Sequence, residues 1–532
     1  MAPRLIRGFL TVGAWTLLSR VLGFARDLML ARFLGTGAAA EAFFVAFSLP
    51  NLFRRFFAEG AFNMAFVPLY AKKLEGEGLD ARAEADAFAR DAVAAMVVAL
   101  TAFSALGVVA MPALVLLMAS GFAGDARFDL AVAYGRVAFP YILLISLAAL
   151  VSGVLNSAGR FLAAAAAPAL LNVVFVGAMA VAWLLPDARL IAWLEAPTHA
   201  RAVGWLLAWS VPVGGAAQLV IVWLAARRAG HRLWPTRRPR LTPDLRRLLV
   251  IAAPAALAGG VVQVNTLVGR QVASLTQEGA IAWLSYADRL YQLPLGLVGI
   301  AIGIVLLPDL SRRVRAGDDA GGRHAFSRAW EFALLLSLPA AVALAVAPLP
   351  IVSTLYESGA FDADDSASTA LATMIYALGL PAFVLQKVLQ PLFFAREDTR
   401  TPLRFAVVSL VVNAVVAVGL APVIGWPAAA LGTTLAAWAM VAFLWRGARR
   451  LGEAARLDDR ARSRTWRVVV ASLGMGAVVW VLWVGMGPLW AGPTRFAALA
   501  VLVGGGMAAY ALLAQLTGAM RLRELRGALR RG

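Results

Sequence analysis

The amino-acid sequence places several charged side chains inside two strongly apolar segments near its N-terminus. Between residues 19 and 60, six charged residues stand in stretches apolar enough to enter a lipid bilayer: Arg20, Arg26, Asp27, Arg54, Arg55 and Glu59. A charge at the centre of a bilayer costs about 3 kcal/mol on insertion scales, so an arginine there should face water or an anionic partner. Because the arginines outnumber the carboxylates, the excess positive charge predicts an anion-binding site within the membrane.

Helical spacing indicates which of these residues can reach a ligand together. Arg20 and Asp27 are seven positions apart and lie on nearly one face of a helix, whereas Arg26 lies about 120° away from Arg20. Arg55 and Glu59 have i,i+4 spacing and can pair, which leaves the preceding arginine available to a ligand. For any single residue the alternative stays open that it forms a structural ion pair between helices.

A second polar cluster occurs in the sequence SYADRLYQLPLG of a later apolar segment. It contains Asp288, Arg289 and Gln292. If the two halves of the chain face each other, Arg289 joins the same anion-binding cavity; the alternative is a local ion pair with Asp288. Arg270 and Lys387 are weaker candidates, since such long side chains can reach the membrane surface or pair locally. Arginine binds phosphate oxygens in a planar, bidentate way and stays charged, so pyrophosphate fits this cluster.

The composition is that of a polytopic membrane protein. Of 532 residues, 61% are hydrophobic and the mean hydropathy is +0.77, which lies outside the range of soluble domains. Apolar runs of about 20 residues predict about fourteen membrane-spanning helices. Basic residues concentrate in alternate loops, so the positive-inside rule places both termini in the cytoplasm. This loop pattern accounts for the net charge of +19 without nucleic acid as a partner.

Recurring motifs predict two copies of a six-helix lobe within the chain. Pro140 matches Pro381, Asn172 matches Asn413, and VPLYAKK matches LPDLSRR, each about 240 residues later. An even number of helices gives both copies the same orientation, so an axis along the membrane normal should relate them, as in many transporters.

The predicted fold class is therefore all-α, with two six-helix lobes related by a pseudo-two-fold axis and two additional C-terminal helices. The predicted boundaries are 1–229 for the N-terminal lobe, 230–247 for a basic cytoplasmic linker, 248–447 for the second lobe, and 448–532 for the last two helices and a basic tail.

The chain lacks the residue patterns of an enzyme. It has no cysteine, and its three histidines, His199, His231 and His324, fall in predicted loops far apart in the sequence, which makes a metal site improbable. No glycine-rich phosphate-binding loop of the P-loop type is present, so we do not expect ATP hydrolysis.

Four motifs closely resemble those of the MurJ (MviN) family of lipid II flippases: SRVLGFARD, FFVAFSLPNLFRRFFAEGAFNMAFVP, FPYILLISLAALVSGVLN and YADRLYQLPLG. The resemblance extends in order over essentially the whole chain. It implies a MOP-superfamily fold with a central cavity between the lobes and a groove at the last two helices for an undecaprenyl tail. The implied activity is alternating-access transport of lipid-linked peptidoglycan precursor to the outer leaflet of the bacterial cytoplasmic membrane.

By position, the resemblance also implies which residues bind the substrate. The substrate-binding set is Arg20, Arg26, Arg54, Arg55 and Arg289, and the supporting cavity set is Ser19, Asp27, Glu41, Glu59, Asp288 and Gln292. Some members are thought to bind sodium through acidic groups, but the matching positions here are Gly269 and Ala417. We therefore do not expect sodium coupling, and only Asn413 and Thr433 remain as weak candidates for a metal site. The expected drive is the membrane potential, without a cofactor.

The expected partners are lipid II and membrane lipids, with cell-wall synthesis proteins as further candidates. Two alternatives stay open: a flippase of the same superfamily for another anionic polyprenyl-linked oligosaccharide, and a non-catalytic scaffold for cell-envelope assembly. A multidrug exporter fits less well, because an excess of arginine repels cationic substrates. Lipid II arriving at the outer leaflet would separate the first hypothesis from the others.

Overall fold

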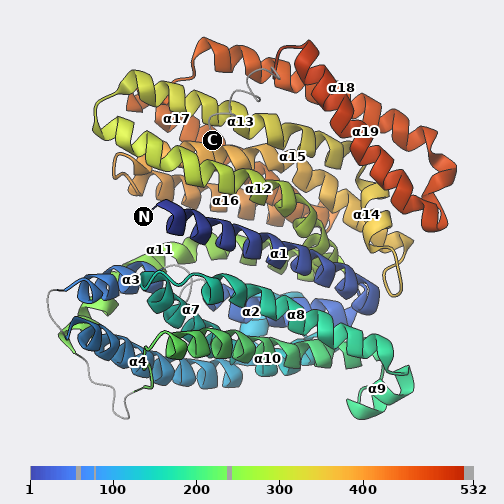
Figure 1. Ribbon diagram of the computed structural model, residues 1–532. Coiled ribbons are helices and arrows are strands. Elements are labelled where there is room, and N and C mark those ends of the chain that lie inside the picture. The colour runs from blue at the N-terminus through green and yellow to red at the C-terminus, as the bar shows by residue number, and fades with distance from the viewer. Residues whose placement is uncertain (1, 55–60, 77–79, 236–241, 521–532) are drawn as a thin grey trace. The chain divides into compact units, whose positions relative to one another are not determined.

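A computed structural model describes residues 2–54, 61–76, 80–235 and 242–520; within these ranges it describes all side chains except those of 2–12, 61–64, 252–264 and 297–308. The described residues form α-helices and short 3-10 helices, with no β-strand among them (Figure 1). The predicted all-α fold class is confirmed. The chain divides into two compact units, unit 1 over Met1–Leu267 and unit 2 over Val268–Gly532.

Unit 1 is built from helices joined mostly by short turns. Its helices are α1 (Ala2–Leu34), α2 (Ala38–Arg54), α3 (Ala61–Leu74), α4 (Ala81–Val109), α5 (Met111–Met118), α6 (Ala126–Ala138), α7 (Tyr141–Ser157), α8 (Leu162–Leu184), α9 (Asp187–Trp193), α10 (His199–Arg228) and the first part of α11 (Pro243–Ser274). Helix α8 packs between α1 and α10, α10 also packs on α7, and α2 packs on α6.

Unit 2 repeats much of this packing order. It contains the rest of α11, then α12 (Ala280–Arg315), α13 (Asp319–Val346), α14 (Pro348–Tyr356), α15 (Ala363–Phe394), α16 (Arg400–Ile424), α17 (Pro427–Ala448), α18 (Asp459–Gly485) and α19 (Arg495–Leu516). Helix α17 packs on α16 and α15, as α10 does on α8 and α7. Helices α18 and α19, which follow the repeat, pack on each other, and α18 also packs on α13.

The two copies differ where the matched prolines stand. In unit 1 the segment around Pro140 is broken into α6 and α7, whereas in unit 2 Pro381 lies inside the continuous helix α15. A proline removes one backbone hydrogen bond, and the surrounding packing decides whether the helix breaks or continues. Ten helical segments in the described part of the chain are long and apolar enough to cross a membrane, and the total of fourteen stays a prediction.

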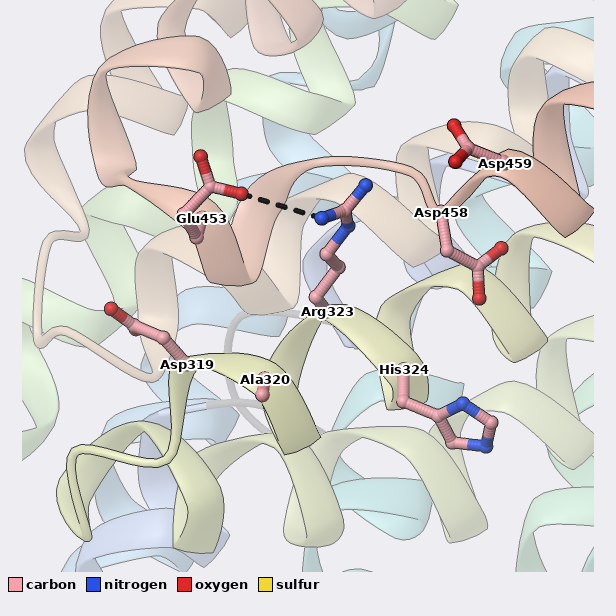
Figure 2. Close-up of a pocket in the computed structure, with 7 residues that line it drawn as sticks. All are labelled: Asp319, Ala320, Arg323, His324, Glu453, Asp458 and Asp459. Carbon is pink, nitrogen blue, oxygen red and sulfur yellow. Dashed lines mark ion pairs between the residues drawn. The ribbon is translucent and has the colours of Figure 1, made fainter.

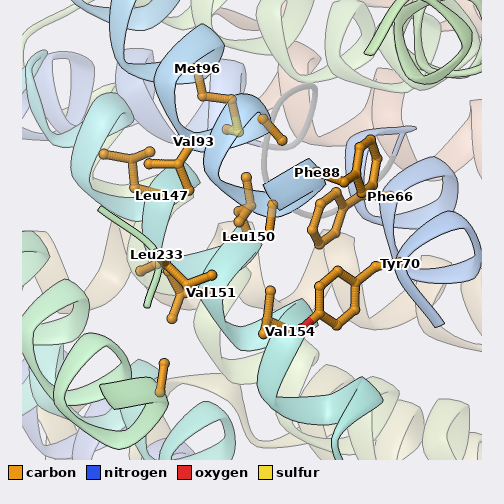
Figure 3. Packing of buried hydrophobic residues seen from close by; sticks show 14 of the residues in the cluster. Phe66, Tyr70, Phe88, Val93, Met96, Leu147, Leu150, Val151, Val154 and Leu233 are labelled. Atoms are coloured by element: carbon orange, nitrogen blue, oxygen red, sulfur yellow. The ribbon is translucent and has the colours of Figure 1, made fainter. Parts of the chain in front are cut away.

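An apolar cluster of unit 1 joins α3, α4, α7 and α10 (Figure 3). Phe66 stacks between Tyr70 and Phe88, with ring centroids 5.6 and 5.4 Å apart. Small residues on α4 at helical spacing, such as Ala85, Ala89 and Ala92, are buried and let the neighbouring helices approach closely. In a bilayer such close packing, more than the removal of apolar surface from water, holds helices together.

The contact between α16 and α17 depends on Gly432. A Cβ atom on this residue would lie 2.6 Å from Asn413 Oδ1 and 2.9 Å from the Asn413 carbonyl oxygen. We expect Gly432→Ala to destabilise the protein by about 1–3 kcal/mol, because overpacking forces the backbones apart. Thermal unfolding of the purified chain measures the change. Gly419→Ala in α16 is the matched control, since its Cβ would meet nothing within 4 Å; an equal loss in both variants would contradict this explanation.

Candidate functional site

Arg26 is held at the contact between α1 and α8. Its Nε and Nη2 atoms donate to Asp27 Oδ1 at 3.0 and 2.7 Å, and its Nη1 atom donates to Asn172 Oδ1 at 3.0 Å. The guanidinium carbon lies 5.7 Å from the centre of the Phe175 ring. Arg26 is 9% exposed and Asp27 is 6% exposed. In this conformation the predicted anion-binding arginine is therefore part of a buried ion pair that is tied to α8.

Asn172 connects this ion pair to the backbone of α1. Its Nδ2 atom donates to the carbonyl oxygen of Ser19 at 3.0 Å and lies 3.5 Å from the Ser19 hydroxyl. A Cβ on Gly23 would lie 3.5 Å from the same Nδ2, an ordinary van der Waals distance, so α1 and α8 are in contact here without requiring a glycine. The sequence marks Asn172 only as a repeat match, and helical spacing does not reveal contacts with residues 153 and 146 positions away.

The other predicted residues of the first two segments are placed differently. Arg20 is exposed on α1 and forms no ion pair with a described residue. Arg54 is half-buried and is the last residue of α2. Arg55 and Glu59 lie outside the described residues, so their pairing stays a prediction.

Glu41 is fully buried in the first turn of α2 and has an arginine partner from α6. Its Oε2 atom accepts from Arg127 Nη1 at 2.8 Å, and Arg127 Nε donates to Asp125 Oδ2 at 2.7 Å. The Arg127 guanidinium also lies 4.6 Å from the centre of the Phe122 ring. Burial raises the pKa of Asp125, but hydrogen bonds and charge from Arg127 outweigh it and hold this pKa below its ordinary value. These contacts join α2 to the start of α6.

The predicted cluster of unit 2 lies on α12. Asp288 and Arg289 are half-buried, and the exposed Gln292 donates from Nε2 to Asp288 Oδ2. The charges of Asp288 and of Arg270 on α11 both act on Tyr376 of α15. Arg270, a weaker candidate for the anion-binding site, therefore lies in the same region as Asp288. A joint cavity of Arg289 with the arginines of unit 1 stays a prediction.

The weak candidates for a metal site lie on α16 and α17. Asn413 is fully buried on α16. Thr433 is half-buried on α17, and its hydroxyl donates to the Ala429 carbonyl oxygen at 3.1 Å. Among the described residues, no group of three or more histidine or carboxylate side chains is arranged to hold a metal ion. A drive by the membrane potential, without sodium coupling, stays a prediction.

The sequence pattern misplaces two of the three histidines. His199 is the first residue of α10 and His324 lies inside α13, so the prediction of loops is wrong for these two. His231 does lie in a loop, but it is only 3% exposed and contacts Asp86 of α4. A histidine next to a run of arginines gives no local signal of burial, and only the packing of the loop against α4 reveals it.

A cavity of about 580 Å³ lies where α13 and α18 begin in unit 2 (Figure 2). Its lining residues are Asp319, Ala320, Arg323, His324, Glu453, Asp458 and Asp459. Arg323 of α13 pairs with Glu453 at 3.5 Å, and Arg328 of α13 pairs with Asp458, whose carboxylate also accepts from the N–H of Ala461 at the start of α18. The charges around this cavity therefore hold the first turn of α18 against α13.

An apolar cluster holds the last two helices to the rest of unit 2. Met475 and Val479 of α18 pack with Leu502 of α19 and with Ala347, which follows α13. The outward faces of α18 and α19 carry exposed apolar side chains such as Trp480. A groove for a lipid tail along these helices stays a prediction.

The fold is shared with solved membrane transporters. A structure described as an inward-facing multidrug resistance MATE transporter of the MOP superfamily matches with a TM-score of 0.65 and 15% identity, covering 82% of this chain and 95% of that one. The class of protein is thus a multi-helix membrane protein with the fold of MOP-superfamily transporters.

Sequence relatives specify the family within this class. A family model described as lipid II flippase MurJ matches residues 30–502. A probable lipid II flippase MurJ from Rhizobium tropici is 42% identical over 535 residues, which cover 99% of this chain and 97% of the relative. The lipid II flippase MurJ from Burkholderia cenocepacia is 37% identical over 458 residues, which cover 84% of each. The chain belongs to the MurJ family of lipid II flippases.

A solved structure agrees with this assignment. It is described as lipid II flippase MurJ in an inward closed conformation, and it matches with a TM-score of 0.77 and 22% identity over 95% of this chain and 98% of that one. The family resemblance of the four sequence motifs is therefore confirmed, as is the prediction of a transporter family with no enzymatic activity.

Proposed function

We propose that this chain moves lipid II, an undecaprenyl-diphosphate-linked disaccharide peptide, from the inner to the outer leaflet of the bacterial cytoplasmic membrane. Relatives described as lipid II flippases align with this chain over nearly their whole length, which supports the same activity here. The chain is a multi-pass protein of the bacterial inner membrane. We place both termini in the cytoplasm, because the basic loops alternate.

The observation that carries this proposal is the position of Arg26. A guanidinium has five N–H donors, and Asp27 and Asn172 use three of those on Arg26. We propose that the remaining two donate to phosphate oxygens of the substrate. Asp27 balances the charge of Arg26 itself while the site is empty, which lowers the cost of holding this arginine inside an apolar helix.

Substrate transport then proceeds by alternating access. The diphosphate and sugars bind Arg20, Arg26, Arg54, Arg55 and Arg289 from the cytoplasmic side, while the polyprenyl tail stays in the lipid alongside α18 and α19. Binding neutralises the arginines and favours rocking of the two lobes, which opens the cavity outward. One charge that crosses the membrane field is worth about 2.3 kcal/mol per 100 mV. The membrane potential can therefore drive the empty, positively charged cavity from the outward-open back to the inward-open state.

The test is to deplete the native lipid II flippase of a bacterial host and express this chain. We expect lipid II to reach the outer leaflet at a rate that restores growth, measured with a reagent that modifies only outward-facing lipid II. The host with an empty vector gives the background. Well-folded protein in the membrane without lipid II at the outer leaflet would contradict the proposal and favour another anionic polyprenyl lipid as the substrate.

A further inference from the structure

The residues that follow α10 form an extended strip with alternating side chains. Gly230 has a φ of +85°, which ends the helix, and the N–H of His231 donates back to the Ala226 carbonyl oxygen at 2.9 Å. From there the side chains alternate between the interior and the surface. His231 is 3% and Leu233 is 2% exposed, whereas Arg232 is exposed and Trp234 is 71% exposed.

The two inward side chains attach the strip to unit 1. His231 Nδ1 lies 2.8 Å from Asp86 Oδ1 of α4, and the Tyr70 hydroxyl of α3 donates to the same oxygen at 3.0 Å. Leu233 packs into the apolar cluster of Figure 3. Arg82 of α4 also donates to the carbonyl oxygen that precedes Gly230, at 2.6 Å. Because a buried polar contact is costly to break, the strip is held in place and its outward side chains are pre-organised.

The outward side chains are strongly basic. The exposed arginines here belong to the end of α10, the strip and the start of α11: Arg227, Arg228, Arg232, Arg246 and Arg247. Within the described residues none of them forms an ion pair. The nearby carboxylate of Asp244 pairs with Lys73 at 2.8 Å. Among the described residues, the positive charge of this surface therefore has no carboxylate partner.

An aromatic pair lies beside these arginines. Trp234 contacts Trp223 of α10 edge-on, with ring centroids 5.6 Å apart. Trp223 is five residues before the end of α10, or about 8 Å along the helix axis. Tryptophan rings are enriched at the level of lipid headgroups, where an apolar ring and a polar N–H both find suitable surroundings. If this pair lies at the headgroup level, the adjacent arginines can reach the phosphate groups.

We propose that Arg227, Arg228, Arg232 and Trp234, the basic strip, bind the headgroup phosphates of anionic phospholipids in the cytoplasmic leaflet. Arginine forms bidentate, charge-assisted hydrogen bonds with phosphate, and Trp234 packs against the upper part of the acyl chains. The bound lipids hold this end of α10 at a constant depth while the protein changes conformation. The inference rests on the proposed cytoplasmic position of the linker and not on the transported substrate.

The opposite end of α10 provides a matched control. There α9 presents an exposed arginine and an exposed tryptophan, Arg189 and Trp193, which is 62% exposed. The acidic residues Asp187 and Glu195 stand close to them in the sequence. This segment has the same two residue types without the net positive charge. Its variant therefore tests whether an exposed arginine and an exposed tryptophan are enough to bind the lipid when the surrounding surface is not basic.

The test measures lipid binding to the purified full chain in detergent, with phosphatidylglycerol or phosphatidylcholine added at equal concentration. Native mass spectrometry counts the lipids that remain bound. We expect the wild type to prefer phosphatidylglycerol, and Arg232→Gln combined with Trp234→Ala to reduce its affinity about fivefold or more, since one arginine near an anionic surface contributes about 1 kcal/mol. Arg189→Gln combined with Trp193→Ala should keep the wild-type preference.

Two results would overturn the inference. One is an unchanged preference in the strip variant, and the other is an equal loss in the control variant. Both pairs of residues are exposed, so both variants should fold, and their melting temperatures verify this. The assay contains neither lipid II nor a membrane orientation, so its outcome is separate from that of the transport test: each proposal can fail while the other stands.

Discussion

Arg26→Ala should reduce the arrival of lipid II at the outer leaflet at least tenfold. The reason is the loss of charge-assisted hydrogen bonds to the diphosphate, each worth about 1.5–3 kcal/mol. The depletion assay described above measures the rate, with the protein level in the membrane as the reference. Arg26→Lys keeps the charge but loses the planar pair of donors, so its transport should lie between the wild type and Arg26→Ala.

A second variant separates the transport role of Arg26 from its structural role. Arg26→Ala alone leaves Asp27 buried at 6% exposure without its main partner, and this costs stability. The double variant Arg26→Met and Asp27→Asn removes both charges and should recover the stability. If Arg26 binds substrate, the double variant folds normally and still fails to transport. If it forms only a structural ion pair, the double variant regains transport. Normal transport in both Arg26→Ala and Arg289→Ala would contradict an arginine-lined cavity.

Arg127→Met should destabilise the protein by about 3–5 kcal/mol, because it removes the cation that pairs with the buried Glu41 carboxylate. Glu41 is 0% exposed, and Arg127 is 7% exposed. Thermal or denaturant unfolding of the purified chain measures the loss. The double variant Glu41→Gln and Arg127→Met should recover most of the stability, because no buried charge is then left unpaired.

The same pair of variants tests the role of Glu41. A residue that only joins α2 to α6 permits normal transport once stability is recovered in the double variant. If Glu41 also contributes to the cavity, the double variant does not transport normally even though its stability is recovered. A loss of less than about 1 kcal/mol in Arg127→Met, the size of a surface ion pair, would contradict the buried contact that the structure places here.

Hydropathy and motif patterns were sufficient to predict the fold class and the family. Apolar runs of membrane-spanning length are a property of each segment alone, and so is the alternation of basic loops. The all-α fold and the MurJ family are accordingly confirmed. Local patterns were not sufficient at the matched prolines, because whether Pro140 breaks a helix and Pro381 does not depends on the helices packed around them.

The partners of the charged side chains were determined by tertiary structure. The sequence marked Arg26, Asp27 and Glu41, but Asn172 and Arg127 join them from 146 and 86 positions away. His231 likewise reaches Asp86 across 145 positions. Helical period reports which side chains share one face of one helix, and it carries no information about which helices cross or where. The sequence by itself therefore determined the membrane class, the family and the charged residues; only the packing of the helices decided which of those charges are neutralised inside the protein.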